Sequence, residues 1–207
     1  MYLRPAFHQT DPTAIRALIH SNPFAQIVTT GPRGMEASHI PVLLVEQGDD
    51  FVLAAHFAAG NPQCAAIGDG ADALLIFSGA HAYISPGWYE TQPSVPTWDF
   101  AAVHVYGPLV AITDHAAIAT DIQGLAAYDP HRFDVMHLAS GYRERMFAGI
   151  RAFRMNPTRV EGQWKMSQNR SQTDRRRVIA ALRGQGDELS TKTAAMIQET
   201  LLAGADS

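Results

Sequence analysis

The sequence predicts a mainly β fold of the α+β class, an antiparallel barrel with helical additions. Many short segments alternate apolar and polar residues with a period of two, which is typical of strands with one buried face. Segments with helical spacing gather between these strands and at the C-terminus instead of alternating with them, which argues against a doubly wound sheet. The 207 residues are 46% hydrophobic and 17% charged, as in ordinary globular proteins, so we expect residues 1–207 to form a single domain.

The N-terminal part of the chain predicts one helix followed by a strand meander. Asp11 followed by Pro12 is typical of a helix N-terminus, and this helix should end before Pro23. Three strand segments are predicted after it, with the sequences FAQIVTT, MEASHIPVLLVE and FVLAAHF. The Gly-Asn-Pro sequence at 60–62 then breaks the pattern, and Asn61 is expected to cap a short helix.

The rest of the chain predicts further strands, a helical region and two terminal helices. The strand ADALLIF leads into a loop from Ser85 to Trp98 that is rich in proline and aromatic residues, and AAVHVYGPLVAIT is the next strand. Residues 114–150 have helical spacing, and RAFRMNPTRVEGQWKM supplies closing strands. Two helices, DRRRVIAALR and STKTAAMIQETLL, are expected between about 172 and 207, the second capped by Ser190.

Composition also bounds the partners and the cellular compartment. Sixteen Lys and Arg residues against 20 Asp and Glu give a net charge of −4, so the charge balance does not support DNA binding. The basic run from Arg175 to Arg177 is typical of a solvated helix face. The single cysteine, Cys64, excludes an intrachain disulfide and favours a cytoplasmic location. Apolar runs are too short to span a membrane, so we expect a soluble protein with no membrane partner.

Candidate binding residues in the first half of the chain lie at strand ends. The segment ASHIP places Ser38 and His39 in a strand, whereas AHFAAGNPQ ends a strand at His56 and begins a helix at Asn61. Because a helix N-terminus has free backbone N–H groups, His56 and Asn61 are candidate phosphate contacts, although an ordinary turn explains the Gly-Asn-Pro sequence equally well. The histidines are scattered without the spacing of metal ligands, so no metal site is expected.

Candidate residues in the second half combine aromatic and amide side chains. Trp88, Tyr89 and Trp98 are predicted to lie in a loop, which suits a flat heterocyclic ligand, although a loop packed over the barrel mouth is the alternative. The segment WKMSQNR delivers a cation, a hydroxyl and two amides at a strand end. We expect this group to face water or an anionic ligand, because buried unpaired polar groups are costly. Its members are Lys165, Ser167, Gln168 and Asn169.

Four motifs, in their order and spacing, resemble the signature segments of the PaiB family of FMN-binding negative transcriptional regulators. They are HFAAGNPQ, HAYISPGWY, VPTWDFAAVHVYG and WKMSQNR, and the resemblance extends over nearly the whole chain. It implies an antiparallel Greek-key split barrel of the FMN-binding type, bound FMN, and a homodimer with the flavin near the subunit interface. The chain departs from the family pattern at Cys64, where tryptophan is common, and at Asp99, where asparagine is usual. Asp99 has no amide N–H to donate, so it is expected to weaken a hydrogen bond to the flavin.

The resemblance implies an FMN-binding, repressor-like transcriptional regulator that senses redox or metabolic state, with DNA as its partner. The alternatives are a flavin reductase or oxidoreductase that uses NAD(P)H and FMN in the same pocket, and a module that binds haem or a ligand similar to pyridoxal phosphate. No catalytic residue is assigned. The residues expected to bind FMN are Ser38, His39, His56, Asn61, Trp88, Tyr89, Trp98, Lys165, Ser167, Gln168 and Asn169.

Overall fold

The computed structural model describes residues 1–131 and 133–203. They form two compact units, each assembled from separate stretches of the chain. Unit 1 contains Met1–Leu18, Ser78–Val103 and the chain from Glu161 on, and unit 2 contains Ile19–Phe77 and His104–Val160. The organisation as a single domain therefore stays a prediction.

Unit 2 is built on antiparallel strands in the order β3-β2-β6-β7-β8-β5-β4. This path is not closed, because β3 and β4 stand at its two ends. The predicted strands are present, but MEASHIPVLLVE divides at Val42 into two strands, β3 and β4, which do not pair with each other. The predicted meander is therefore wrong, and two separate hairpins, β2–β3 and β4–β5, take its place. The bounds are β2 (Phe24–Gly31), β3 (Gly34–Pro41), β4 (Leu43–Gln47), β5 (Asp50–Ala58), β6 (Asp72–Ile84), β7 (Thr97–Ile112) and β8 (Ile150–Met155).

The core of unit 2 follows from the period of two in these strands. In β2, Ala25, Ile27 and Thr29 are buried and their neighbours are more exposed, so one face of the strand points inward. Phe57 on β5 and Phe153 on β8 are fully buried, with ring centroids 4.9 Å apart. Aromatic packing of this kind fixes β5 against β8.

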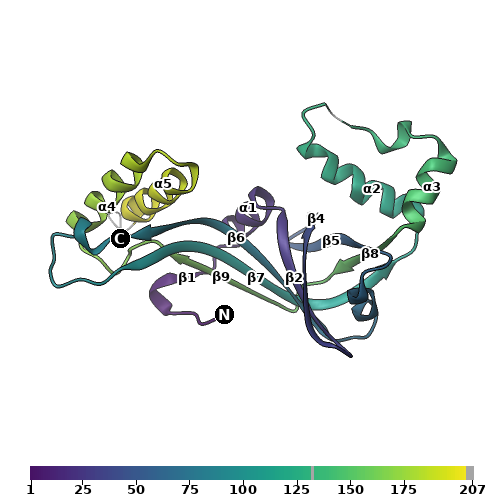
Figure 1. The fold of residues 1–207 in the computed structure, drawn as a ribbon, viewed down its shortest axis with the longest axis horizontal. Helices are drawn as coiled ribbons and strands as arrows, with labels where there is room; N and C mark the ends of the chain where they lie inside the picture. The colour runs from purple at the N-terminus through teal and green to yellow at the C-terminus, as the bar shows by residue number, and fades with distance from the viewer. Residues whose placement is uncertain (132, 204–207) are drawn as a thin grey trace. The chain divides into compact units, whose positions relative to one another are not determined.

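A helical segment lies between β7 and β8 in unit 2, as the helical spacing of residues 114–150 predicts (Figure 1). Asp114 caps its first helix by accepting a hydrogen bond from the backbone N–H of Ala117 at 2.9 Å. An ion pair between Asp121 and Arg154, 2.7 Å long, ties that helix to β8. The segment contains α2 (His115–Leu125), η4 (Ala126–Tyr128), η5 (Val135–His137) and α3 (Ser140–Ala148).

Unit 1 contains the remaining parts of β6 and β7, which run through both units. A short strand, β1 (His8–Gln9), pairs antiparallel with β9 (Arg159–Lys165), and β9 pairs with β7. Gly162 of β9 permits the close approach of β1, because a Cβ atom there would lie 2.8 Å from the backbone oxygen of Gln9. The first helix, α1 (Pro12–Ser21), starts and stops as predicted, and Asp11 caps it by accepting the N–H of Thr13.

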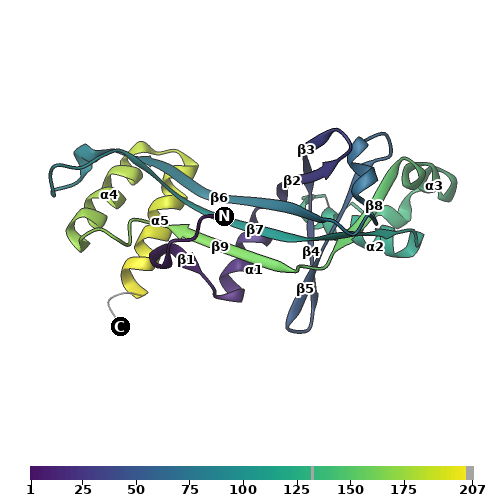
Figure 2. The same ribbon diagram turned by 90° about the horizontal axis from the view of Figure 1, so that it is seen from below.

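Two helices complete unit 1, α4 (Gln172–Gln185) and α5 (Glu188–Ala203), and Figure 2 shows them side by side. The turn between them uses Gly186 with a φ of 77°, a conformation that favours glycine. The predicted cap at Ser190 is wrong. Asp187 caps α5 instead, because its carboxylate accepts the backbone N–H of Ser190 at 2.9 Å and Ser190 lies inside the first turn.

The basic run on α4 is only partly a solvated face. Arg175 is buried, and its Nη2 donates to the backbone oxygen of Ile197 at 3.1 Å and to Thr200 Oγ1 at 2.6 Å. The prediction of a solvated run is therefore wrong for Arg175, which joins α4 to α5, whereas Arg176 and Arg177 are exposed. Within residues 1–131 and 133–203, no helix combines the length and apolarity that a bilayer crossing requires.

Candidate functional site

The residues expected to bind FMN are divided between the two units. Ser38, His39, His56 and Asn61 lie in unit 2. The others lie in unit 1, and they are Trp88, Tyr89, Trp98, Lys165, Ser167, Gln168 and Asn169.

In unit 2, Ser38 and Asn61 come together around Gln63, a residue that the sequence did not single out. Asn61 Nδ2 donates to Ser38 Oγ at 3.1 Å, and Ser38 Oγ donates to Gln63 Oε1. Gln63 is buried, and its Nε2 donates to Thr29 Oγ1 at 3.0 Å and to the backbone oxygen of Glu36 at 3.1 Å. The Gln63 cluster thus connects the loop after β5 to β2 and β3.

This arrangement changes the interpretation of the phosphate position at Asn61. The helix that begins there, η2 (Pro62–Ala66), is a single short turn of 3₁₀ helix. Asn61 Oδ1 already accepts the backbone N–H of Gln63 at 2.9 Å, so the capping interaction takes the N–H that a phosphate would need. A phosphate contact at Asn61 would have to compete with this internal hydrogen bond.

The two histidines of unit 2 have different surroundings. His39 is exposed on β3, and its ring stacks on Phe24 with centroids 5.9 Å apart. His56 lies on β5 and lines a small cavity with Ile118 and Asp121 of α2, where burial lowers the pKa of its imidazole. The structure therefore places His56 beneath α2.

In unit 1, a buried carboxylate organises the polar side chains at the end of β9. Asp99 is 1% exposed, and it accepts hydrogen bonds from Ser167 Oγ at 2.6 Å and from Lys165 Nζ at 3.4 Å. Burial raises the pKa of Asp99, although both partners and the charge of Arg170 oppose the shift. Lys165 Nζ also donates to Thr97 Oγ1 at 2.6 Å and to the backbone oxygen of Trp98.

We expected this cluster to face water or a ligand, but most of its polar groups are paired with other groups of the protein. The partners of Lys165 and Ser167 are groups of β7 that lie more than 65 positions away in the sequence. Gln168 is also paired internally, because its Oε1 accepts the N–H of Met166 at 2.6 Å and its Nε2 donates to the oxygen of Trp164 at 2.5 Å. Asn169 is exposed. Ser167 has a φ of 56°, an uncommon conformation for a residue other than glycine, and this turn directs its hydroxyl to Asp99.

The aromatic residues of unit 1 separate into open and closed positions. Trp98 is 55% exposed, and its ring lies 6.2 Å from those of both His81 and Tyr83, centroid to centroid. We call these three residues the aromatic group. Trp98 belongs to β7, so its predicted place in the loop is wrong; the strand begins one residue earlier, at Thr97. Tyr89 is buried, with the Arg170 guanidinium 4.1 Å above its ring, so that ring is not open for stacking.

The loop that carries Trp88 is attached to α4 through a carboxylate that sequence reasoning missed. Asp174 accepts the backbone N–H of Glu90 at 2.7 Å and that of Thr91 at 3.4 Å. Burial favours a higher pKa for Asp174, but these hydrogen bonds and that of Ser171 together hold the pKa below its usual range. The Ser-x-x-Asp pattern at residues 171–174 is typical of a helix N-terminus and could have predicted the start of α4. It does not predict that Asp174 also binds the loop.

The aromatic residues of unit 1 are suited to binding the ring of a flavin, whereas the polar residues are less suited to binding its phosphate. The aromatic group offers an open surface on which a flat ring system can stack. Lys165 is the cation beside it, with 21% of its side chain exposed, but three oxygen partners occupy its three N–H donors. A phosphate at Lys165 would therefore have to replace one of these partners.

Comparison with known proteins places the chain in a family. A family model described as "Putative FMN-binding domain" matches residues 1–159, so α4 and α5 lie beyond the matched range. "Protease synthase and sporulation protein PAI 2" from Bacillus subtilis (strain 168) is 32% identical over 205 residues, which cover 97% of this chain and 98% of the relative.

Solved structures of other proteins share the fold. The FAD and heme binding protein from Mycobacterium smegmatis superposes with a TM-score of 0.58 at 13% identity, over 76% of this chain and 73% of that one. The flavocytochrome Anf3 from Azotobacter vinelandii has a TM-score of 0.58 at 13% identity, over 79% of this chain and 72% of that one. At this identity the likeness concerns the fold alone, and the predicted antiparallel split barrel with helical additions is confirmed.

Proposed function

This chain belongs to the FMN-binding domain family and FMN is its cofactor, and from that premise we propose that it is a flavin-dependent transcriptional regulator. Bound FMN supplies a ring that takes up and releases one or two electrons. The redox or metabolic state of the cell would then set the state of the regulator. The likeness to the Bacillus subtilis protein over nearly its whole length supports this role, since that relative is named a protease synthase and sporulation protein.

The observation that carries flavin binding in this structure is the aromatic group. Trp98 and Tyr83 are large side chains that are 55% and 45% exposed, at the point where β7 begins and β6 ends. Exposed aromatic surface of this size on neighbouring strands is suited to a planar ligand or a second subunit. We propose that Trp98 packs against the isoalloxazine ring and that Asn169 and Trp88 contact its edge.

The other expected contacts take supporting roles in this proposal. Asp99, Ser167 and Lys165 hold the ends of β7 and β9 together beneath Trp98, and Lys165 contributes positive charge near the ligand. Ser38, His39, His56 and Asn61 remain proposed contacts in unit 2. We propose that the active form is a homodimer.

A titration of FMN fluorescence tests the flavin contact. Replacing Trp98 with alanine should weaken FMN binding about tenfold, because stacking on a large aromatic ring is worth ~1 kcal/mol or more beyond buried area. Tyr2→Ala is the control, since Tyr2 is another exposed aromatic residue of unit 1, at 81% exposure, and lies outside the aromatic group. Equal FMN affinities of Trp98→Ala and the parent protein would refute the stacking role.

A flavin reductase or oxidoreductase is the second candidate function, and the openness of the aromatic group favours it. A flavin on an exposed surface can be reached by NAD(P)H, whereas the charge of −4 and the burial of Arg175 give little basic surface for DNA. DNA mobility shifts with promoter fragments at several salt concentrations, run with oxidised and reduced FMN, test the regulator. Flavin reduction by NAD(P)H without any DNA shift at low salt would favour the enzyme.

A further inference from the structure

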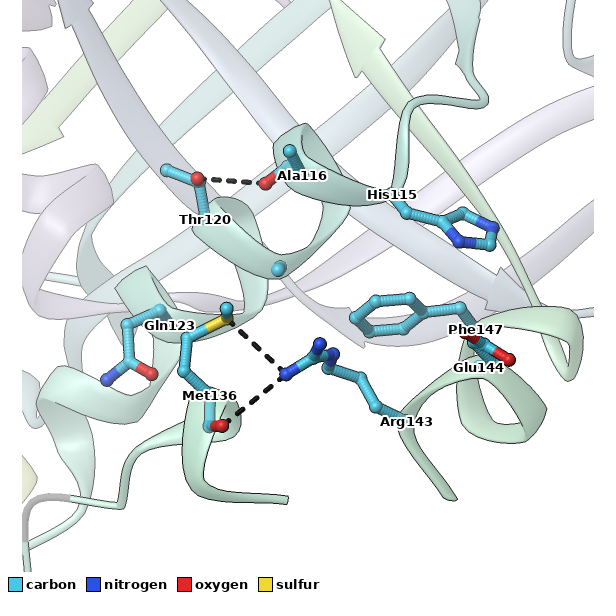
Figure 3. Close-up of a pocket in the computed structure, with 9 residues that line it drawn as sticks. His115, Ala116, Thr120, Gln123, Met136, Arg143, Glu144 and Phe147 are labelled. Carbon is cyan, nitrogen blue, oxygen red and sulfur yellow. Dashed lines mark hydrogen bonds between the residues drawn. The ribbon is translucent and has the colours of Figure 1, made fainter. Parts of the chain in front are cut away.

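A cleft in the helical segment of unit 2 involves none of the residues expected to bind FMN. It lies between α2 and α3, has a volume of about 590 Å³, and is closed on one side by Met136 of η5 (Figure 3). A volume in this range is typical of sites for small organic molecules. The cleft is therefore large enough to hold a ligand of its own.

The residues of α2 explain why the cleft is hollow. This helix packs the larger side chains of Ile118 and Ile122 into the core of unit 2 and presents Ala116 and Ala119 to the cleft. Phe147 of α3 is buried on the opposite wall, with the His115 ring edge-on to it at 5.5 Å between centroids. Small residues facing an aromatic ring leave an apolar slot wide enough for a flat body.

Arg143 brings a positive charge to this apolar slot. Figure 3 shows its guanidinium directed from α3 toward Met136, beside Phe147. It is half-buried, and the two hydrogen bonds that it makes among the described residues run from Nη1 to the backbone oxygen and the Sδ of Met136, at 3.4 and 3.7 Å. Both are long and neither acceptor is charged, so the guanidinium keeps donors for a carboxylate, which it can bind in two-pronged fashion.

We propose that this cleft binds a small organic monocarboxylate with an apolar or aromatic body. The carboxylate pairs with Arg143, and the body packs between Ala116, Ala119 and Phe147. Glu144 also lines the cleft and is exposed. Its negative charge disfavours an anion of higher charge such as a phosphate, and this distinguishes the ligand from the phosphate-bearing FMN.

Phenylacetate and its neutral counterpart phenylacetamide are the probes for this site. Both are titrated into the full-length protein labelled with ¹⁵N, and amide chemical shifts are followed. Phenylacetate should change the chemical shifts of the amides of α2 and α3, and these changes should saturate as its concentration rises. Phenylacetamide should bind at least about tenfold more weakly, because it cannot form the ion pair with Arg143. Equal binding of the two probes, or no saturable shift in α2 and α3 at millimolar phenylacetate, overturns the proposal.

Three variants separate the site from a general charge effect. Arg143→Gln should weaken phenylacetate binding at least about tenfold, and Ala116→Leu should abolish it by filling the slot from an exposed helical position. Arg145→Gln is the matched control, because Arg145 is on the same helix, carries the same charge and does not line the cleft. Equal loss in Arg143→Gln and Arg145→Gln would contradict the proposal, and an unchanged FMN titration in all three would show that the flavin site is separate.

Discussion

Asp99 is a carboxylate in a place where burial works against its charge. Its fully buried side chain faces Ser167 and Lys165, and burial still raises its pKa above the ordinary range. A carboxyl whose pKa is higher in the folded protein binds protons more tightly there, so its contribution to stability is present at low pH and is lost as pH rises through the folded-state pKa. Ser167 and Lys165 oppose this rise in the pKa and offset part of the cost of burying the charged form.

The consequence at this position is a pH-dependent effect of the Asp99→Asn substitution. Asparagine does not ionise, so the free energy of unfolding of the variant relative to the parent should rise as pH increases from about 4, the ordinary pKa of an aspartate, and should level off above the folded-state pKa. Urea unfolding from pH 4 to 8 measures both proteins. Parallel stability profiles would show that Asp99 has no raised pKa.

The same residues show what a sequence can and cannot predict about a site. The segment WKMSQNR was recognisable as a polar cluster at a strand end, and this position is correct, since β9 ends at Lys165. Its partners were not recognisable, because Asp99 and Thr97 lie on another strand and only the tertiary fold brings them to Lys165 and Ser167. Local spacing therefore located the cluster but not the interactions that satisfy it.

At the scale of elements, periodicity predicted most strands and helices because one face of each is buried. The predictions were wrong where one side chain determines a helix boundary. Asp187, for example, caps α5 in place of the predicted Ser190. Asp174 is another such side chain. It stands in the first turn of α4, yet two of its hydrogen bonds hold the loop from Ser85 to Pro96.

Replacing Asp174 with alanine should free this loop. The backbone N–H groups of Glu90 and Thr91 lose their acceptor, so their hydrogen exchange should accelerate about tenfold or more, as expected for the loss of a charge-assisted hydrogen bond. Asp187→Ala is the control, because it removes a helix cap from the same pair of helices without touching the loop. Equal acceleration in both variants would mean that the loop depends only on the stability of the helices.

At the scale of the whole molecule, the exposed apolar residues bear on association. Phe24 and Met35 of unit 2 are 67% and 81% exposed on β2 and β3, and Trp98 of unit 1 is also open. Exposed apolar surface on a protein with only 17% charged residues favours covering by a second copy.

We expect sedimentation velocity at micromolar concentration to give twice the chain mass of 22.5 kDa. Phe24→Glu should shift the protein toward monomer, because it places a charge in the covered surface. Tyr142→Glu, at an open aromatic position on α3, should not. A monomeric parent protein that still binds FMN would exclude the dimer as a requirement for the flavin site.

The division of the chain between the two units sets the order in which the protein can fold during synthesis. Unit 2 is complete once Val160 has left the ribosome, whereas unit 1 still lacks everything from Glu161 on. Until residues 161–207 have been synthesised, the part of β7 in unit 1 lacks its partner strand β9, and α4 and α5 are absent. Unpaired strand edges are prone to aggregation, so the nascent chain is most prone to aggregate after Val160 and before residue 207 have been synthesised. The last 47 residues supply the missing parts of unit 1 and so cover the exposed edge of β7.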